Sequence, residues 1–132
     1  MAKKMPKEAA LLTEWLDRLG MRDWAVMLQS DVDPSDMSIQ NALGCTSWEE
    51  STKSAVIQIV NPAKLEGLTR EFDYEQILVH EILHLKTSLL SSREEEDTLS
   101  DRVLHQIVDD LARAMIDLKH KKRKAKHEVS DL

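Results

Sequence analysis

The segment His80-Glu81-Ile82-Leu83-His84 constrains this chain more than any other, because it lies within a run of apolar residues. Residues four positions apart lie one above the other on an α-helix, so a helix here brings both imidazoles to one face. At about 100° per residue the two histidines lie roughly 40° apart, on the flank of a wide apolar arc. The pattern predicts a helix from about residue 73 to residue 90, with both histidines beside its buried face.

Two histidines at this spacing are typical ligands of a zinc ion. Glu81 points about 100° around the helix from His80, where it can act as general base on a metal-bound water. The alternative is a pair of helix-surface histidines that bind no metal. We favour a Zn²⁺ site with His80 and His84 as ligands and Glu81 as the catalytic base, since the apolar helix places the motif against a core.

A catalytic zinc site needs a third protein ligand and an open fourth position. The residues that follow the motif leave the third ligand open. The candidates are Glu94, Glu95, Glu96, Asp97, Asp101, His105 and Asp109. The last three share one stripe at intervals of four residues, beside the apolar face of a predicted last helix. A residue on that stripe is placed to face the metal helix.

The rest of the chain predicts an α+β domain with an N-terminal helix and a long C-terminal helix. Residues 7–19 have a helical apolar pattern, and Gly20 stands where the helix should end. Ser92 and Glu95 form a capping box for a last helix that runs to about residue 119. Three segments have strand patterns, the last two joined by a polar hairpin turn: 24–28, 43–48 and 55–60. This order predicts helices on a small, mostly antiparallel three-stranded sheet.

With these residues the chain resembles the zincin metallopeptidases, most closely the gluzincin type and the small stand-alone metallopeptidase-like proteins of phages, prophages and bacteria. In gluzincins the third ligand belongs to a pattern E-x-x-x-D on a later helix. The matching stretch here runs from His105 to Asp109, with His in the place of Glu. The resemblance therefore implies a minimal zincin-like domain with His105 as third zinc ligand and Asp109 as the carboxylate that orients a metal histidine. Asp101 lies nearer the apolar arc and is the alternative third ligand.

The same resemblance implies a zinc-dependent metallopeptidase whose substrate is a peptide or protein. Zincins have an edge strand above the metal helix that can pair with an extended substrate, and residues 55–60 are expected to form it. Tyr74 is the only tyrosine, and its position on the helical wheel indicates packing rather than support of an oxyanion. The alternative from another class is a non-catalytic zincin-fold module, in which zinc is structural and the protein binds a partner.

Length and charge limit the remaining possibilities. The 132 residues suit one domain over residues 1–118 and a basic tail over residues 119–132. The tail holds six of the 18 Lys and Arg, which leaves 12 basic and 22 acidic side chains in the body. This acidic body argues against nucleic-acid binding except through the tail. With one cysteine, Cys45, no signal peptide and no apolar run of 18 residues, we expect a cytoplasmic protein without a membrane span and a buried Cys45. The oligomeric state is open.

Overall fold

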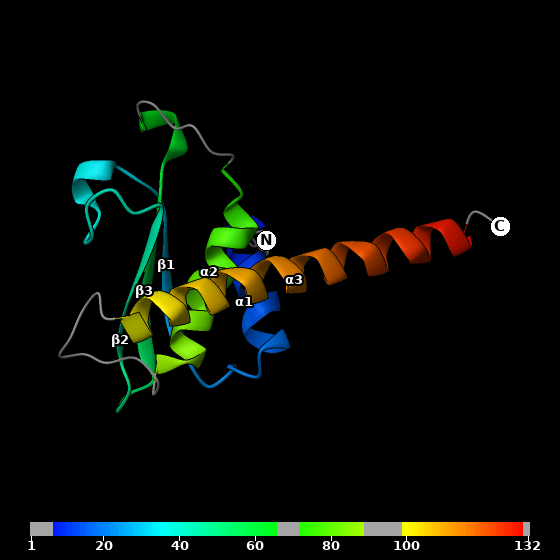
Figure 1. Cartoon of the computed structure of the whole chain (residues 1–132), viewed down its shortest axis with the longest axis horizontal. Coiled ribbons are helices and arrows are strands. Elements are labelled where there is room, and N and C mark those ends of the chain that lie inside the picture. The colour runs from blue at the N-terminus through cyan, green and yellow to red at the C-terminus, as the bar shows by residue number, and fades with distance from the viewer. Residues whose placement is uncertain (1–6, 66–71, 89–98, 131–132) are drawn as a thin grey trace, which may run out of the picture. The chain divides into compact units, whose positions relative to one another are not determined.

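The computed structural model of the chain describes residues 7–65, 72–88 and 99–130 (Figure 1). In these ranges it contains helices and a three-stranded sheet, so the predicted α+β class is confirmed. The elements are α1 (Lys7–Arg18), β1 (Ala25–Val32), β2 (Gly44–Glu49), β3 (Ser54–Val60), α2 (Tyr74–Lys86) and α3 (Leu99–Ser130), with 3-10 turns at Pro34–Asp36 and Pro62–Lys64. The chain divides into two compact units, Met1–Ser88 and Leu89–Leu132.

The sheet of the first unit is mixed, with the strand order β1-β3-β2. β1 and β3 are parallel neighbours. β2 and β3 are antiparallel neighbours, joined by the predicted hairpin turn. The prediction of a mostly antiparallel sheet is therefore wrong, because one of the two pairings is parallel. The prediction that residues 55–60 form an edge is also wrong, since they lie in the central strand, β3. The physical reason is that β3 has a neighbouring strand at each of its edges, and its nearly continuous apolar run AVIQIV suits a central strand.

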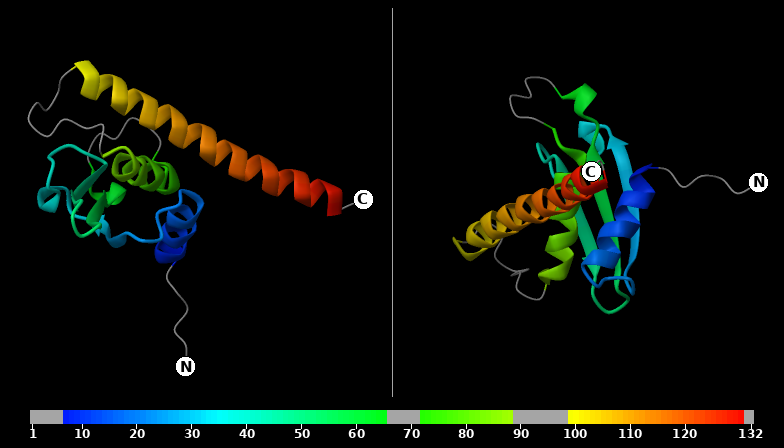
Figure 2. Two further views of the ribbon diagram at one scale, coloured as in Figure 1. Left: turned by 90° about the horizontal axis from the view of Figure 1, so that it is seen from below. Right: turned by 90° about the vertical axis from the view of Figure 1, so that its right-hand side faces the viewer.

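Helices α1 and α2 lie on one face of this sheet (Figure 2). Apolar side chains from β3 and α2 fill the core and are fully buried: Ile57, Ile59, Leu78, Ile82 and Leu85. Trp15 of α1 is also buried, and its indole Nε1 donates a hydrogen bond of 2.8 Å to Glu75 Oε2 on α2. Each large apolar side chain buried in this way contributes roughly 1.5–3 kcal/mol. These contacts hold α2 against α1 and the sheet.

The ends of both helices in the first unit follow their sequence signals. Gly20 follows α1 with φ +69°, a left-handed conformation that glycine adopts without a steric penalty. Asp73 caps α2 by accepting a hydrogen bond of 3.2 Å from the Gln76 backbone N–H. At the other end, the backbone N–H of Thr87 donates to the carbonyl of Leu83 at 2.9 Å. The helix predicted from about residue 73 to residue 90 is thus confirmed over Tyr74–Lys86.

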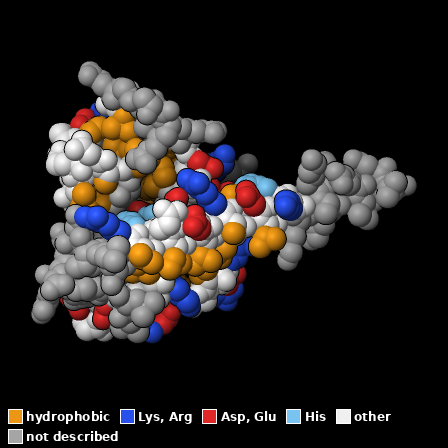
Figure 3. Space-filling model, viewed as in Figure 1, with side chains coloured by type: hydrophobic (Ala, Val, Ile, Leu, Met, Phe, Trp, Pro, Cys, Tyr) orange, Lys and Arg blue, Asp and Glu red, His pale blue; other side chains and the backbone are white. Residues whose placement is uncertain are grey.

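The second unit consists, in its described part, of the 32-residue helix α3. This helix continues past the predicted end near residue 119 to Ser130, so the basic residues of the tail are helical. Large apolar side chains gather on the exposed surface of α3 (Figure 3): Val103, Ile107, Leu111 and Leu118. The capping pair Ser92 and Glu95 lies outside the described residues.

Among the described helices, none is both long enough and apolar enough to cross a membrane. The cytoplasmic location and the division into a domain of residues 1–118 and a tail stay predictions.

Candidate metal centre

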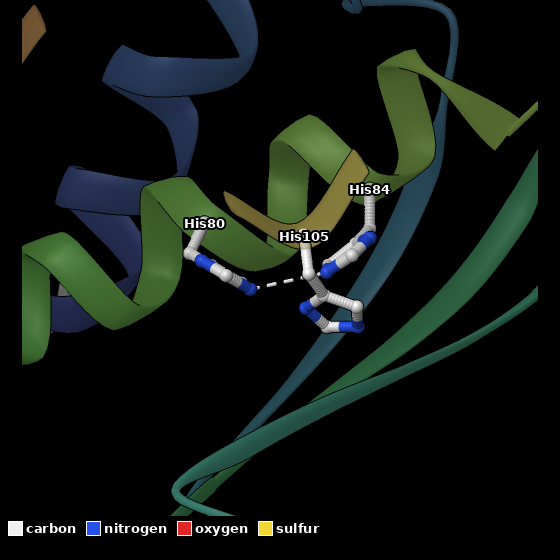
Figure 4. Close-up of side chains that lie close together, drawn as sticks. All are labelled: His80, His84 and His105. Atoms are coloured by element: carbon white, nitrogen blue, oxygen red, sulfur yellow. Dashed lines mark hydrogen bonds between the residues drawn. The ribbon is translucent and has the colours of Figure 1, made fainter. Parts of the chain in front are cut away.

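Helix α2 presents His80 and His84 on one side, one turn apart (Figure 4). Their Nε2 atoms lie 3.0 Å from each other, and the two rings are 4.8 Å apart between centroids at an angle of 68°. Two nitrogens bound to one tetrahedral zinc at the usual bond length lie roughly 3.3 Å apart. The pair therefore fits chelation of a zinc ion with only a small side-chain adjustment.

The backbone of α2 is held by packing of the residues on both sides of each histidine. Val79 and Ile82 are fully buried, and Leu83 is nearly so, whereas both histidines are partly exposed. Ligands on a well-packed helix keep their relative position better than ligands on loops. This burial pattern leaves the ring nitrogens accessible to an ion while the helix stays fixed.

Glu81 points from the same helix toward β2. Its side chain is buried, at 6% exposure, and Oε1 accepts a hydrogen bond of 2.7 Å from Thr46 Oγ1. Burial raises the pKa of the Glu81 carboxyl from 4.5 to about 7, and the hydrogen bond from Thr46 opposes this rise. A carboxyl with a pKa near the working pH is well matched to general base catalysis.

Gly44 allows β2 to lie directly against α2 at this point. A Cβ atom on Gly44 would lie 2.8 Å from Ile77 Cγ2, 3.2 Å from Glu81 Cγ and 3.3 Å from Glu81 Oε2. Any side chain here would therefore collide with Ile77 and crowd the carboxyl group. Neither Gly44 nor Thr46 was predicted as part of the site, although a glycine inside a strand is a known sign of close backbone approach.

The predicted third ligand belongs to the second unit. His105 lies on α3 with an exposed side chain. Asp109, one turn further, forms an ion pair of 3.2 Å with Arg113. Asp101 lies in the first turn of α3, but its side chain is outside the described residues. The candidates Glu94–Asp97 also lie outside them, so the choice of third ligand stays a prediction.

Two other residues discussed from the sequence have packing roles. The Tyr74 hydroxyl lies 2.5 Å from Ser30 Oγ on β1, and burial raises the pKa of this phenol. Cys45 is buried, as expected, and its thiol donates a hydrogen bond of 3.1 Å to Gln58 Oε1. Tyr74 thus ties α2 to the sheet.

Within the first unit the chain brings together two imidazoles spaced for one metal ion and a buried carboxyl one residue from the first of them. These are among the groups that a metal-assisted hydrolysis requires, which also include a third ligand. Comparison with known protein families, with curated proteins and with solved structures found no match for this chain.

Proposed function

We propose that this protein is a zinc-dependent metallopeptidase-like hydrolase that acts on a peptide or protein. The observation that carries the proposal is the pair of histidine Nε2 atoms at 3.0 Å on a helix that also holds the buried Glu81. A purely structural zinc site has no use for a buried glutamate beside its ligands. Catalysis gives that glutamate a role.

Each residue has a distinct task in this proposal. His80 and His84 bind the ion through Nε2, and His105 supplies the third ligand, with Asp101 as the alternative. Zinc, when bound, polarises the scissile carbonyl and makes water more acidic. Glu81 accepts the proton of the attacking water and returns it to the leaving amine. Asp109 accepts a hydrogen bond from a metal histidine and so fixes its tautomer.

We propose that β2, rather than β3, is the strand that pairs with an extended substrate. β2 has a neighbour on only one side among the described strands, namely β3. It also lies against α2 at Glu81, through Gly44 and Thr46. A peptide bound to the open edge of β2 would extend the sheet beside the metal helix, a common mode of peptide recognition.

The second candidate is a non-catalytic zincin-fold module in which the ion stabilises the fold and the protein binds a partner. It is favoured by one observation: the Tyr74 hydroxyl, which could have supported an oxyanion, lies against Ser30. The raised pKa of Glu81 favours the enzyme instead.

Substitution of Glu81 by glutamine separates the two candidates. Glu81→Gln keeps the shape of the side chain but removes its basicity, and Glu8→Gln, at an exposed position on α1, is the matched control. Zinc content is measured by elemental mass spectrometry, and cleavage is measured on a mixed peptide library. We expect one zinc per chain in all three proteins and a cleavage rate roughly 100-fold or more lower in Glu81→Gln alone.

Two other results would count against the enzyme. Cleavage by Glu81→Gln at the parental rate contradicts the role of Glu81 as base. A zinc-loaded parent that cleaves no peptide in the library favours the non-catalytic module.

A further inference from the structure

We propose that Thr46 is a positioning residue that holds Oε1 of Glu81 and so orients the carboxyl group that takes the proton from water. Gly44 completes the arrangement by allowing the backbone of β2 to lie against the Glu81 side chain. The inference rests on the function proposed above and assigns β2 a direct part in orienting the base.

The hydroxyl of Thr46 is well placed to fix the carboxylate. Thr46 Oγ1 donates to Glu81 Oε1 at 2.7 Å, and the same hydroxyl lies 3.4 Å from the backbone carbonyl oxygen of Glu81. A hydroxyl donor on an ionised acceptor makes a stronger hydrogen bond than a pair of neutral groups. Threonine is also restricted at χ1 by its β-branch, so the donor itself has little freedom.

Gly44 and Thr46 project from the same face of β2, because they are two residues apart in one strand. Thr46 contacts Oε1, whereas a side chain at Gly44 would begin 3.3 Å from Oε2. Both carboxylate oxygens therefore lie close to β2. Oε1 accepts a hydrogen bond from Thr46, and Oε2 lies close to the strand at Gly44.

The hydrogen bond from Thr46 has a mechanistic consequence. While it persists, the carboxyl group need not rotate when it accepts a proton from water. Without the hydroxyl, the side chain of Glu81 can turn about its terminal torsions, which have broad preferences. Misplacement of a catalytic group by about 1 Å can lower the rate about 100-fold.

The test compares Thr46→Val, which keeps the shape but removes the hydroxyl, with Thr46→Ser, which keeps the hydroxyl. Thr13→Val, at an exposed position on α1, is the matched control. Zinc content, kcat and KM on a peptide that the parent cleaves, and the NMR order parameter of the Glu81 methylene groups are measured for each. Circular dichroism verifies the fold, and Thr46→Ala replaces Thr46→Val if the latter is unfolded.

We expect the variant that lacks the hydroxyl to bind one zinc and to lose roughly 10- to 100-fold in kcat at unchanged KM. Its Glu81 order parameter should fall, and Thr46→Ser should restore both quantities. An unchanged kcat in a folded variant without the hydroxyl overturns the inference. If the parent cleaves no peptide, the proposed function fails separately, and an unchanged Glu81 order parameter still overturns the role of Thr46.

Discussion

Substitution of Glu81 by glutamine should stabilise the metal-free protein at alkaline pH. Burial raises the pKa of the Glu81 carboxyl from 4.5 to about 7, so the folded state holds this proton more tightly than the unfolded chain does. The Glu81 carboxyl therefore makes its full contribution to the free energy of unfolding below about pH 4.5. This contribution falls as pH rises and is lost above about pH 7. Glutamine stays neutral throughout and can still accept a hydrogen bond from Thr46.

The size of the effect follows from the two pKa values. The difference between a pKa of 4.5 and a pKa of about 7 corresponds to about 3 kcal/mol of unfolding free energy, since each pKa unit is 1.36 kcal/mol. The unfolded carboxyl is already largely ionised at about pH 5, so part of the loss occurs below that pH. Between about pH 5 and about pH 8 the parent should lose roughly 2–3 kcal/mol relative to Glu81→Gln.

The assay is urea unfolding followed by tryptophan fluorescence, at both pH values, with a chelator present so that no metal is bound. The assay compares the free energy of unfolding of the parent with that of Glu81→Gln, because the contributions of other groups that titrate between these pH values largely cancel in the difference. Asp17, Asp23 and Asp33 have pKa values lowered by hydrogen bonds, so they titrate on the acid side of the range. Glu8→Gln is the control and should differ from the parent by less than about 0.5 kcal/mol at either pH.

A stability difference between parent and Glu81→Gln that is the same at both pH values would refute this reasoning. It would mean that the carboxyl is not buried in the metal-free protein. A parent that gains stability relative to Glu81→Gln as pH rises would also contradict the prediction. It would indicate that the hydrogen bond from Thr46 outweighs burial.

Three further predictions concern the third ligand and the fold. His105→Ala should weaken zinc binding, measured by competition with a chromogenic chelator, much more than Asp101→Ala does; the opposite order would make Asp101 the third ligand. Ile57→Ala, at a fully buried position of the central strand, should lower the free energy of unfolding by about 2–5 kcal/mol in urea titrations. Gly20→Ala should cost about 1–2 kcal/mol through its positive φ alone, because the new Cβ meets nothing closer than Lys86 Nζ at 3.9 Å; a neutral result would contradict the left-handed end of α1.

Helix α2 could be predicted from the sequence because its signals are local. The apolar arc and the histidine spacing both act within one helix, and α2 follows them. The hairpin between β2 and β3 is similarly local, since a polar turn joins two short strands. Interactions between neighbours in the chain leave a periodic pattern that can be interpreted without a structure.

The order of the strands could not be predicted in the same way. β1 and β3 are separated in the chain by β2, and the parallel pairing depends on how the long connection after β1 crosses the sheet. The expectation that residues 55–60 form an edge came from the resemblance to zincins and not from the residues of the strand. The contacts of Glu81 with Gly44 and Thr46 were missed for the same reason, because they join residues about 35 positions apart.

The most direct test of the central claim is zinc stoichiometry of the purified, chelator-treated chain after reloading. Two histidine nitrogens at 3.0 Å predict one tightly bound zinc per chain, lost in both His80→Ala and His84→Ala. His120→Ala, on the exposed surface of α3, is the matched control and should bind zinc as the parent does. A parent that takes up no zinc, or a His84→Ala variant that binds zinc as tightly as the parent, would contradict the metal centre proposed for α2.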